Sequence, residues 1–186
     1  MDGLSLKPAP EPLALVQAFV NTRNVMHSYD LLEDADEATA WHFEHGFLEG
    51  DARVGEADRR RLVAFREGLR GLLLAHNGES GGDAGAEALN ELVSPAPLTV
   101  RFGPEGEPYL TATGDPDTVE GVMGMVLTAI VLSGADGTWR RLKACRNEGC
   151  LWAFYDSSKN RSGSWCTMDV CGARAKMRAY RRRRSP

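Results

Sequence analysis

The chain has 186 residues, of which 42% are hydrophobic and 26% are charged, a composition that argues against intrinsic disorder. The formal net charge of −4 is unevenly distributed, because residues 1–139 hold nine basic and twenty-three acidic residues, whereas residues 140–186 hold thirteen and three. The most apolar run, residues 121–134, is too short to cross a bilayer, and no secretory signal is visible, so we expect a cytoplasmic protein.

The first half of the chain predicts mainly helices. Apolar residues recur at three- and four-residue steps over residues 57–76, which is typical of a long amphipathic helix. Shorter helices are predicted over 13–22 and 36–45. The segment 78–85 is rich in Gly and Ser and predicts a loop, and a short helix over 86–92 is expected to follow it.

A β-hairpin and a central helix are predicted next. Residues 98–102 alternate with a period of two, and residues 109–113 form a second strand after a turn rich in Gly and Pro. Asp115 then fits the cap of a helix that has Pro116 at its first position. Apolar residues cover more than one face of the run 119–130, so we expect this helix at the centre of the core.

The expected fold class is α+β and mostly helical. We expect an acidic helical domain with a β-hairpin over residues 1–136, and a small basic module over residues 137–186 that ends in a helix. The Gly-containing segment 133–137 predicts the boundary. The opposite charges of the two parts indicate different partners, and the basic module is the candidate for binding a polyanion.

Four cysteines lie within the basic module as two close pairs, in the pattern Cys145-x4-Cys150-x15-Cys166-x4-Cys171. Two pairs of thiolates on separate turns suit a tetrahedral zinc ion, and four sulfur ligands close the coordination sphere, so we expect one structural Zn²⁺ per chain. The alternatives are disulfides, free thiols or a lone iron ion. Removing one ligand is expected to unfold the module and to leave the acidic domain folded.

The remainder of the module predicts a strand over 151–155, a polar turn over 156–164 and a helix after Cys166. The aromatic residues of the module are expected to pack around the metal rather than to stack on bases. One side of the helix carries an apolar stripe, formed by Val170, Ala173, Met177 and Tyr180. Basic residues of the helix and the polar turn are the candidate nucleic-acid contacts: Lys159, Arg161, Arg174, Lys176, Arg178, Arg181, Arg182, Arg183 and Arg184. The alternative is a solvated tail, or arginines that interact with the C-terminal dipole of the helix.

The cysteine pattern, together with the residues between the pairs, closely resembles the CGNR-type zinc finger. Its signature tetrapeptide is here Cys171-Gly172-Ala173-Arg174, in which Ala173 replaces the usual asparagine of the family. The zinc finger of this type occurs at the C-terminus of bacterial proteins described as stress-responsive transcription regulators. The replacement alters no ligand, so the resemblance still implies a zinc site, although the missing asparagine affects a hydrogen bond near the metal or a contact with nucleic acid.

The acidic part resembles the ABATE domain that precedes this zinc finger in the family, on the residues 19–22, 30–32, Trp41 and 46–48. The resemblance implies that the domain binds a small ligand or senses a condition. Asn21, Arg23 and Trp41 are candidate ligand-binding residues, since polar groups beside an apolar wall are typical of a pocket. The alternative is that Asn21 and Arg23 simply end a helix and that Trp41 packs in the core.

The sequence therefore leaves three candidate functions. We expect a regulator that binds duplex DNA and responds to a small-molecule effector. The alternatives are an RNA-binding or ribosome-associated zinc module, and an adaptor that binds proteins. The sequence contains no nucleophile–base arrangement, phosphate-binding glycine loop or paired-carboxylate motif, so we do not expect an enzyme. The sequence does not define the oligomeric state.

Overall fold

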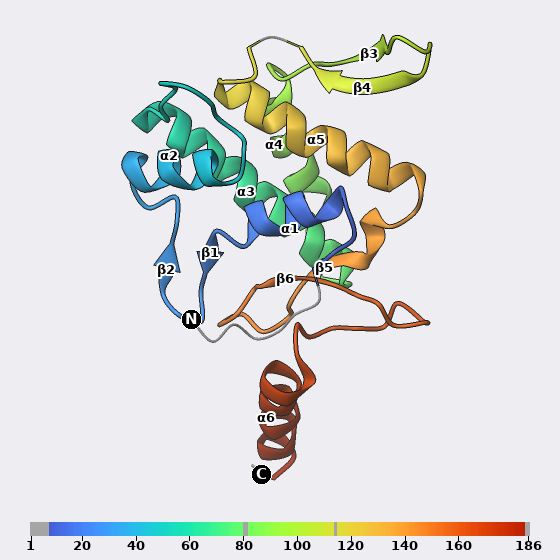
Figure 1. The fold of residues 1–186 in the computed structure, drawn as a ribbon. Helices are drawn as coiled ribbons and strands as arrows, with labels where there is room; N and C mark the ends of the chain where they lie inside the picture. The colour runs from blue at the N-terminus through green and yellow to red at the C-terminus, as the bar shows by residue number, and fades with distance from the viewer. Residues whose placement is uncertain (1–7, 80–81, 114, 185–186) are drawn as a thin grey trace.

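The computed structural model describes residues 8–79, 82–113 and 115–184, which form a mostly helical fold with small antiparallel hairpins (Figure 1). The helices are α1 (Leu13–Val20), α2 (Ala35–Glu44), α3 (Glu56–His76), α4 (Gly82–Val93), α5 (Val119–Ala135) and α6 (Ala173–Arg184), with short turns η1 (Trp139–Arg141) and η2 (Met168–Gly172). The strands are β1 (Arg23–Asn24), β2 (Tyr29–Asp30), β3 (Leu98–Phe102), β4 (Pro108–Ala112), β5 (Leu142–Ala144) and β6 (Ala153–Tyr155). Each strand pairs only within its own hairpin: β1 with β2, β3 with β4, and β5 with β6.

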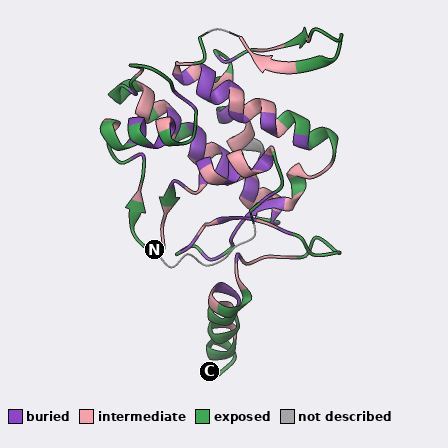
Figure 2. Cartoon of the chain, in the orientation of Figure 1, coloured by how far each residue is buried: buried purple, intermediate pink, exposed green. Residues whose placement is uncertain are grey.

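Helices α1, α3 and α5 form the centre of the molecule. Each buries one set of apolar side chains, such as Phe19 of α1, Phe65 of α3 and Met123 of α5, all with 0% exposure. The sequence predicts α3 from the helical spacing of its apolar residues, and it predicts a central α5 from apolar residues on more than one face. Both predictions are confirmed. In Figure 2 the buried residues concentrate on these helices, whereas α6 is almost entirely exposed.

The predicted hairpin is confirmed as β3 and β4, with Val100 opposite Leu110 in an antiparallel register. The hairpin packs on α5 at Gly124. Only glycine allows this close approach, because a Cβ at position 124 would collide with Ala112 of β4. The sequence also predicts the strand at 151–155, which is shorter in the structure and forms β6. Its partner β5 was not predicted.

Two predicted boundaries are wrong. Helix α5 is capped by Thr118 rather than Asp115, because the Thr118 hydroxyl accepts a bond from the Gly121 N–H at 3.2 Å, whereas the Asp115 carboxylate accepts from Asp117 within the preceding turn. Helix α4 begins inside the predicted loop 78–85, of which residues 80–81 lie outside the described residues. Packing of α4 on α3 stabilises this longer helix.

The strands β5 and β6 share the core of the helical body. Their residues Leu142, Ala144 and Ala153 are fully buried, in the same apolar cluster as α1, α3 and α5. Helix α6 instead projects away from the body at the bottom of Figure 1. None of the helices in the described ranges is both long and apolar enough to cross a membrane.

Candidate metal centre and nucleic-acid surface

The four cysteines converge on one point, although they come from different turns of the module. All four are buried, and their Sγ atoms lie within 4.8 Å of one another. The Sγ atoms of Cys150 and Cys166 are 3.6 Å apart, and those of Cys166 and Cys171 are 3.7 Å apart. Four sulfurs about 2.3 Å from a tetrahedral zinc ion would be separated by about 3.8 Å. The cysteines are not disulfide-bonded, and they form a site for one structural Zn²⁺.

A tight backbone turn brings the first two ligands together. The Cys145 N–H donates to the Trp152 carbonyl at 3.0 Å, which continues the pairing of β5 with β6 beyond the strands. The Cys150 N–H donates to the Asn147 carbonyl at 2.7 Å, and Leu151 adopts a φ of 54°. The chain thereby reverses between Cys145 and Cys150, and both thiols face the same point.

The thiols influence one another's ionisation. Hydrogen bonds from Cys150 and Cys166 lower the pKa of the Cys145 thiol, and the contact with Cys145 raises the pKa of Cys150. Contacts with Cys145 and Cys150 raise the pKa of Cys166 as well. A cluster of four thiolates therefore requires a cation, and zinc binding at this site releases protons.

Asn147 joins the metal site to the basic helix, and sequence analysis missed it. Its buried side chain donates from Nδ2 to the Sγ of Cys171 at 3.5 Å, and its Oδ1 accepts from the Arg178 guanidinium at 3.3 Å. A bond of this kind orients a ligand and stabilises its thiolate. The only signal in the sequence is an amide side chain located between the first two ligands.

Replacing Asn147 with alanine should weaken zinc binding by about 10- to 100-fold, because the Cys171 sulfur loses its amide donor. Competition with a chromophoric chelator measures the change in affinity. Asn160, an exposed asparagine in the polar turn, provides the matched control Asn160→Ala. Equal zinc affinities for the two variants would exclude a role for Asn147 at the metal.

A buried ion pair organises the polar turn that carries Lys159 and Arg161. The Lys143 ammonium donates to the Asp156 carboxylate at 2.7 Å and to the carbonyls of Arg161 and Gly163 at 2.6 and 3.1 Å. Both side chains of the pair are at most 5% exposed. Burial alone would raise the pKa of Asp156, but the bonds from Lys143, Ser158 and Gly163 outweigh it and lower the pKa to about 2. The turn is therefore held in a fixed shape.

The variant Asp156→Asn should lose about 3–5 kcal/mol of stability at neutral pH, because it leaves the Lys143 ammonium buried without a counter-charge. The folded pKa of about 2 lies below the ordinary 3.8, so ionised Asp156 stabilises the fold above about pH 4. That contribution is lost as the pH falls from about 4 to about 2, and the variant should lack this part of the pH dependence. Urea unfolding at several pH values measures both effects. Glu148 is an exposed carboxylate, so Glu148→Gln is the control. A comparable loss of stability in this variant at neutral pH would contradict the prediction.

The predicted basic contacts lie on two exposed segments. Lys159 and Arg161 are exposed on the polar turn, and the seven basic residues of α6 are all exposed. Helix α6 contains no acidic residue, and within Ala173–Arg184 no residue is buried. The helix therefore presents a dense positive charge to solvent.

The apolar stripe of the basic helix packs on the metal module only at its first residue, Val170. Val170 contacts the cysteine cluster, but Met177 and Tyr180 are 52% and 54% exposed. The aromatic residues Trp152, Phe154 and Trp165 pack around the cysteines, as expected from the sequence, whereas Tyr155 packs against the core of the helical body. The module thus fills its small core without using α6.

The three candidate ligand-binding residues each have separate partners in the structure. Asn21 accepts from the Ala153 N–H at 2.8 Å and donates to the Ala153 carbonyl at 2.9 Å, so it holds β6. Arg23 forms an ion pair with Glu67 at 3.8 Å, and Trp41 is stacked between His45 and Phe47. A cavity of about 290 Å³ lies elsewhere, and its lining includes none of the three. Ligand binding by these residues remains a prediction.

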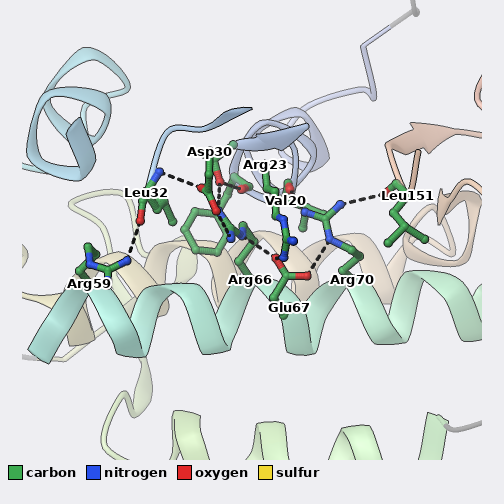
Figure 3. Close-up of polar contacts among 11 residues, drawn as sticks. Val20, Arg23, Asp30, Leu32, Arg59, Arg66, Glu67, Arg70 and Leu151 are labelled. Carbon is green, nitrogen blue, oxygen red and sulfur yellow. Dashed lines mark hydrogen bonds and ion pairs between the residues drawn. The ribbon is translucent and has the colours of Figure 1, made fainter. Parts of the chain in front are cut away.

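A network of buried arginines on α3 connects the helical body to the metal module (Figure 3). Arg66 is fully buried and pairs with Asp30 through two bonds of 2.5 and 2.8 Å. Arg70 pairs with Glu67 and donates to the carbonyl of Val20 at 2.6 Å and to that of Leu151, next to the ligand Cys150, at 2.8 Å. The signal in the sequence was the presence of arginines between the helically spaced apolar residues of the predicted helix 57–76.

The chain matches two family models. One, described as "CGNR zinc finger", matches residues 141–184. The other is ABATE, described as "Putative stress-induced transcription regulator", and it matches residues 13–136, more than half of the chain. A comparison with curated proteins finds no match.

Proposed function

Because the chain belongs to the ABATE family and ends in a CGNR zinc finger, we propose that it regulates transcription by binding duplex DNA through α6. The observation that carries the proposal is the exposed helix with seven basic and no acidic residues, which projects from an otherwise acidic body (Figure 1). Phosphate contacts by Lys and Arg supply most of the affinity of such a surface.

The metal has a structural role in this proposal. The four sulfur ligands fill the tetrahedral coordination of zinc and leave no position for a reactive water, so the ion stabilises the module and does not itself catalyse a reaction. The zinc site fixes the start of α6, since Cys171 lies in η2, two residues before the helix begins at Ala173. Four reduced thiols also suit the cytoplasm.

The acidic body contributes in two ways. Its negative charge repels nucleic acid, and this repulsion limits loose binding by the basic helix. The arginine network of α3 joins the body to the metal module at Leu151 (Figure 3), so a ligand that binds the body could alter the support of α6. A small-molecule effector is part of the proposal.

Fluorescence anisotropy with the zinc-loaded full chain tests the function. Labelled duplex DNA, duplex RNA and single-stranded DNA of equal length are compared at several salt concentrations. We expect the tightest binding to duplex DNA, with a steep salt dependence. Tighter binding to RNA would favour a ribosome-associated module, and binding to none of the three would favour a protein adaptor.

A further inference from the structure

Helix α6 exposes two large apolar side chains that no other part of the described chain covers. Met177 is 52% exposed and Tyr180 is 54% exposed. With about 3.6 residues per turn, both lie on the line through Ala173 and Arg184. The Arg184 guanidinium donates to the Tyr180 hydroxyl at 2.6 Å and stacks on its ring at 5.5 Å, so this contact orients the ring along the helix.

Basic residues flank this apolar line on both sides. Successive residues are rotated by about 100°, which places Arg174, Arg178 and Arg181 along one flank of α6. Lys176 and Arg183 lie along the other flank, roughly opposite the first. Around the helix axis, the apolar line therefore lies between two positively charged flanks.

This arrangement matches the major groove of duplex DNA. The groove is about 12 Å wide and admits one α-helix of similar diameter, with a row of phosphates along each side and base edges at its floor. Charge complementarity on both flanks of α6 orients the apolar line toward the floor. The methyl group of thymine is the apolar feature that the floor offers. Because the major groove of duplex RNA is deep and narrow, it does not admit the helix.

We infer that Met177 and Tyr180 are specificity-determining residues, which contact thymine methyl groups while α6 lies in the major groove of duplex DNA. The inference rests on the proposed function and adds the groove, the orientation of the helix and the base feature that it reads. Phosphate contacts from the flanks position the helix, and the apolar contacts distinguish sequences.

The test begins with duplexes selected from a random pool by the zinc-loaded full chain. Each thymine is then replaced by deoxyuridine, which removes only the methyl group. Wild-type protein should bind about fourfold more weakly for each contacted methyl that is lost. Met177→Ala and Tyr180→Ala should each bind the thymine duplex more weakly and should lose part of this thymine preference, with an unchanged salt slope.

Two further variants complete the design. Met177→Leu keeps an apolar side chain and should retain the thymine preference. Arg182→Ala removes a positively charged side chain on the side of α6 opposite the apolar line. This variant should weaken binding to the thymine and deoxyuridine duplexes equally. Zinc content and circular dichroism verify that each variant is folded.

The two possible failures are distinguishable. Tight DNA binding with equal affinities for thymine and deoxyuridine duplexes, or a preference that survives both alanine variants, would overturn the inference and leave the proposed function intact. Absence of binding to duplex DNA would overturn both.

Discussion

The variant Cys166→Ala should lose its zinc, unfold the metal module and lower the melting temperature of the helical body by about 10 °C. Sequence analysis predicts that the acidic domain stays folded, and the structure gives a physical reason to expect that its stability nevertheless falls. Strands β5 and β6 complete the core of α1, α3 and α5. The side chains of Gln17, Arg70 and Asn77 donate to carbonyls of the module. Losing partners for buried donors costs about 1–3 kcal/mol each, and each kcal/mol lowers the melting temperature by about 2–4 °C.

Three measurements check this result on the full chain. Elemental analysis reports zinc, circular dichroism reports the melting of helices, and hydrogen exchange reports local protection. We expect faster exchange in the C-terminal half of α3, where His76 contacts the Leu142 carbonyl at 2.9 Å. Ser157 is exposed in the polar turn, so Ser157→Ala is the control and should keep its zinc. Unchanged exchange in α1 and α3 of the zinc-free variant would show that the module is an independent unit.

Replacing Arg181–Arg184 together with alanines should flatten the salt dependence of DNA binding. Each phosphate contact contributes about 0.9 log units of affinity per log unit of salt. If about five basic residues engage, wild-type affinity falls roughly a thousandfold for a fivefold rise in salt. The quadruple variant should lose up to four of these contacts and should weaken all sequences alike. Alanine is a strong helix former, so α6 should persist.

The matched control removes positive charge from the helical body. Arg60 and Arg101 are exposed and lie on α3 and β3, so the double variant Arg60→Ala/Arg101→Ala lowers the net charge without changing α6. Anisotropy titrations at four or more salt concentrations give the slopes. A slope that is the same for wild type and the quadruple variant would identify the arginine run as a solvated tail.

Sequence determined the parts of this protein that depend on local pattern. The spacing of Cys145, Cys150, Cys166 and Cys171 predicts the zinc site, since two close pairs of thiols suit one tetrahedral ion. The apolar period over 57–76 predicts α3, and alternation with turn residues predicts β3 and β4. These signals extend over a few neighbouring residues, so one sequence is enough to read them.

Tertiary structure decided the roles of polar residues that act at long range. Asn21 is a candidate ligand-binding residue by its sequence, and the structure adds that its amide holds Ala153, 132 residues away in the chain. Asp30 pairs with the buried Arg66 across 36 residues, and Asn147 reaches both Cys171 and Arg178. Each partner is set by the packing of α1, α3 and the metal module, which local propensity does not encode. Buried polar groups require partners, and only the folded chain determines which partners lie within reach.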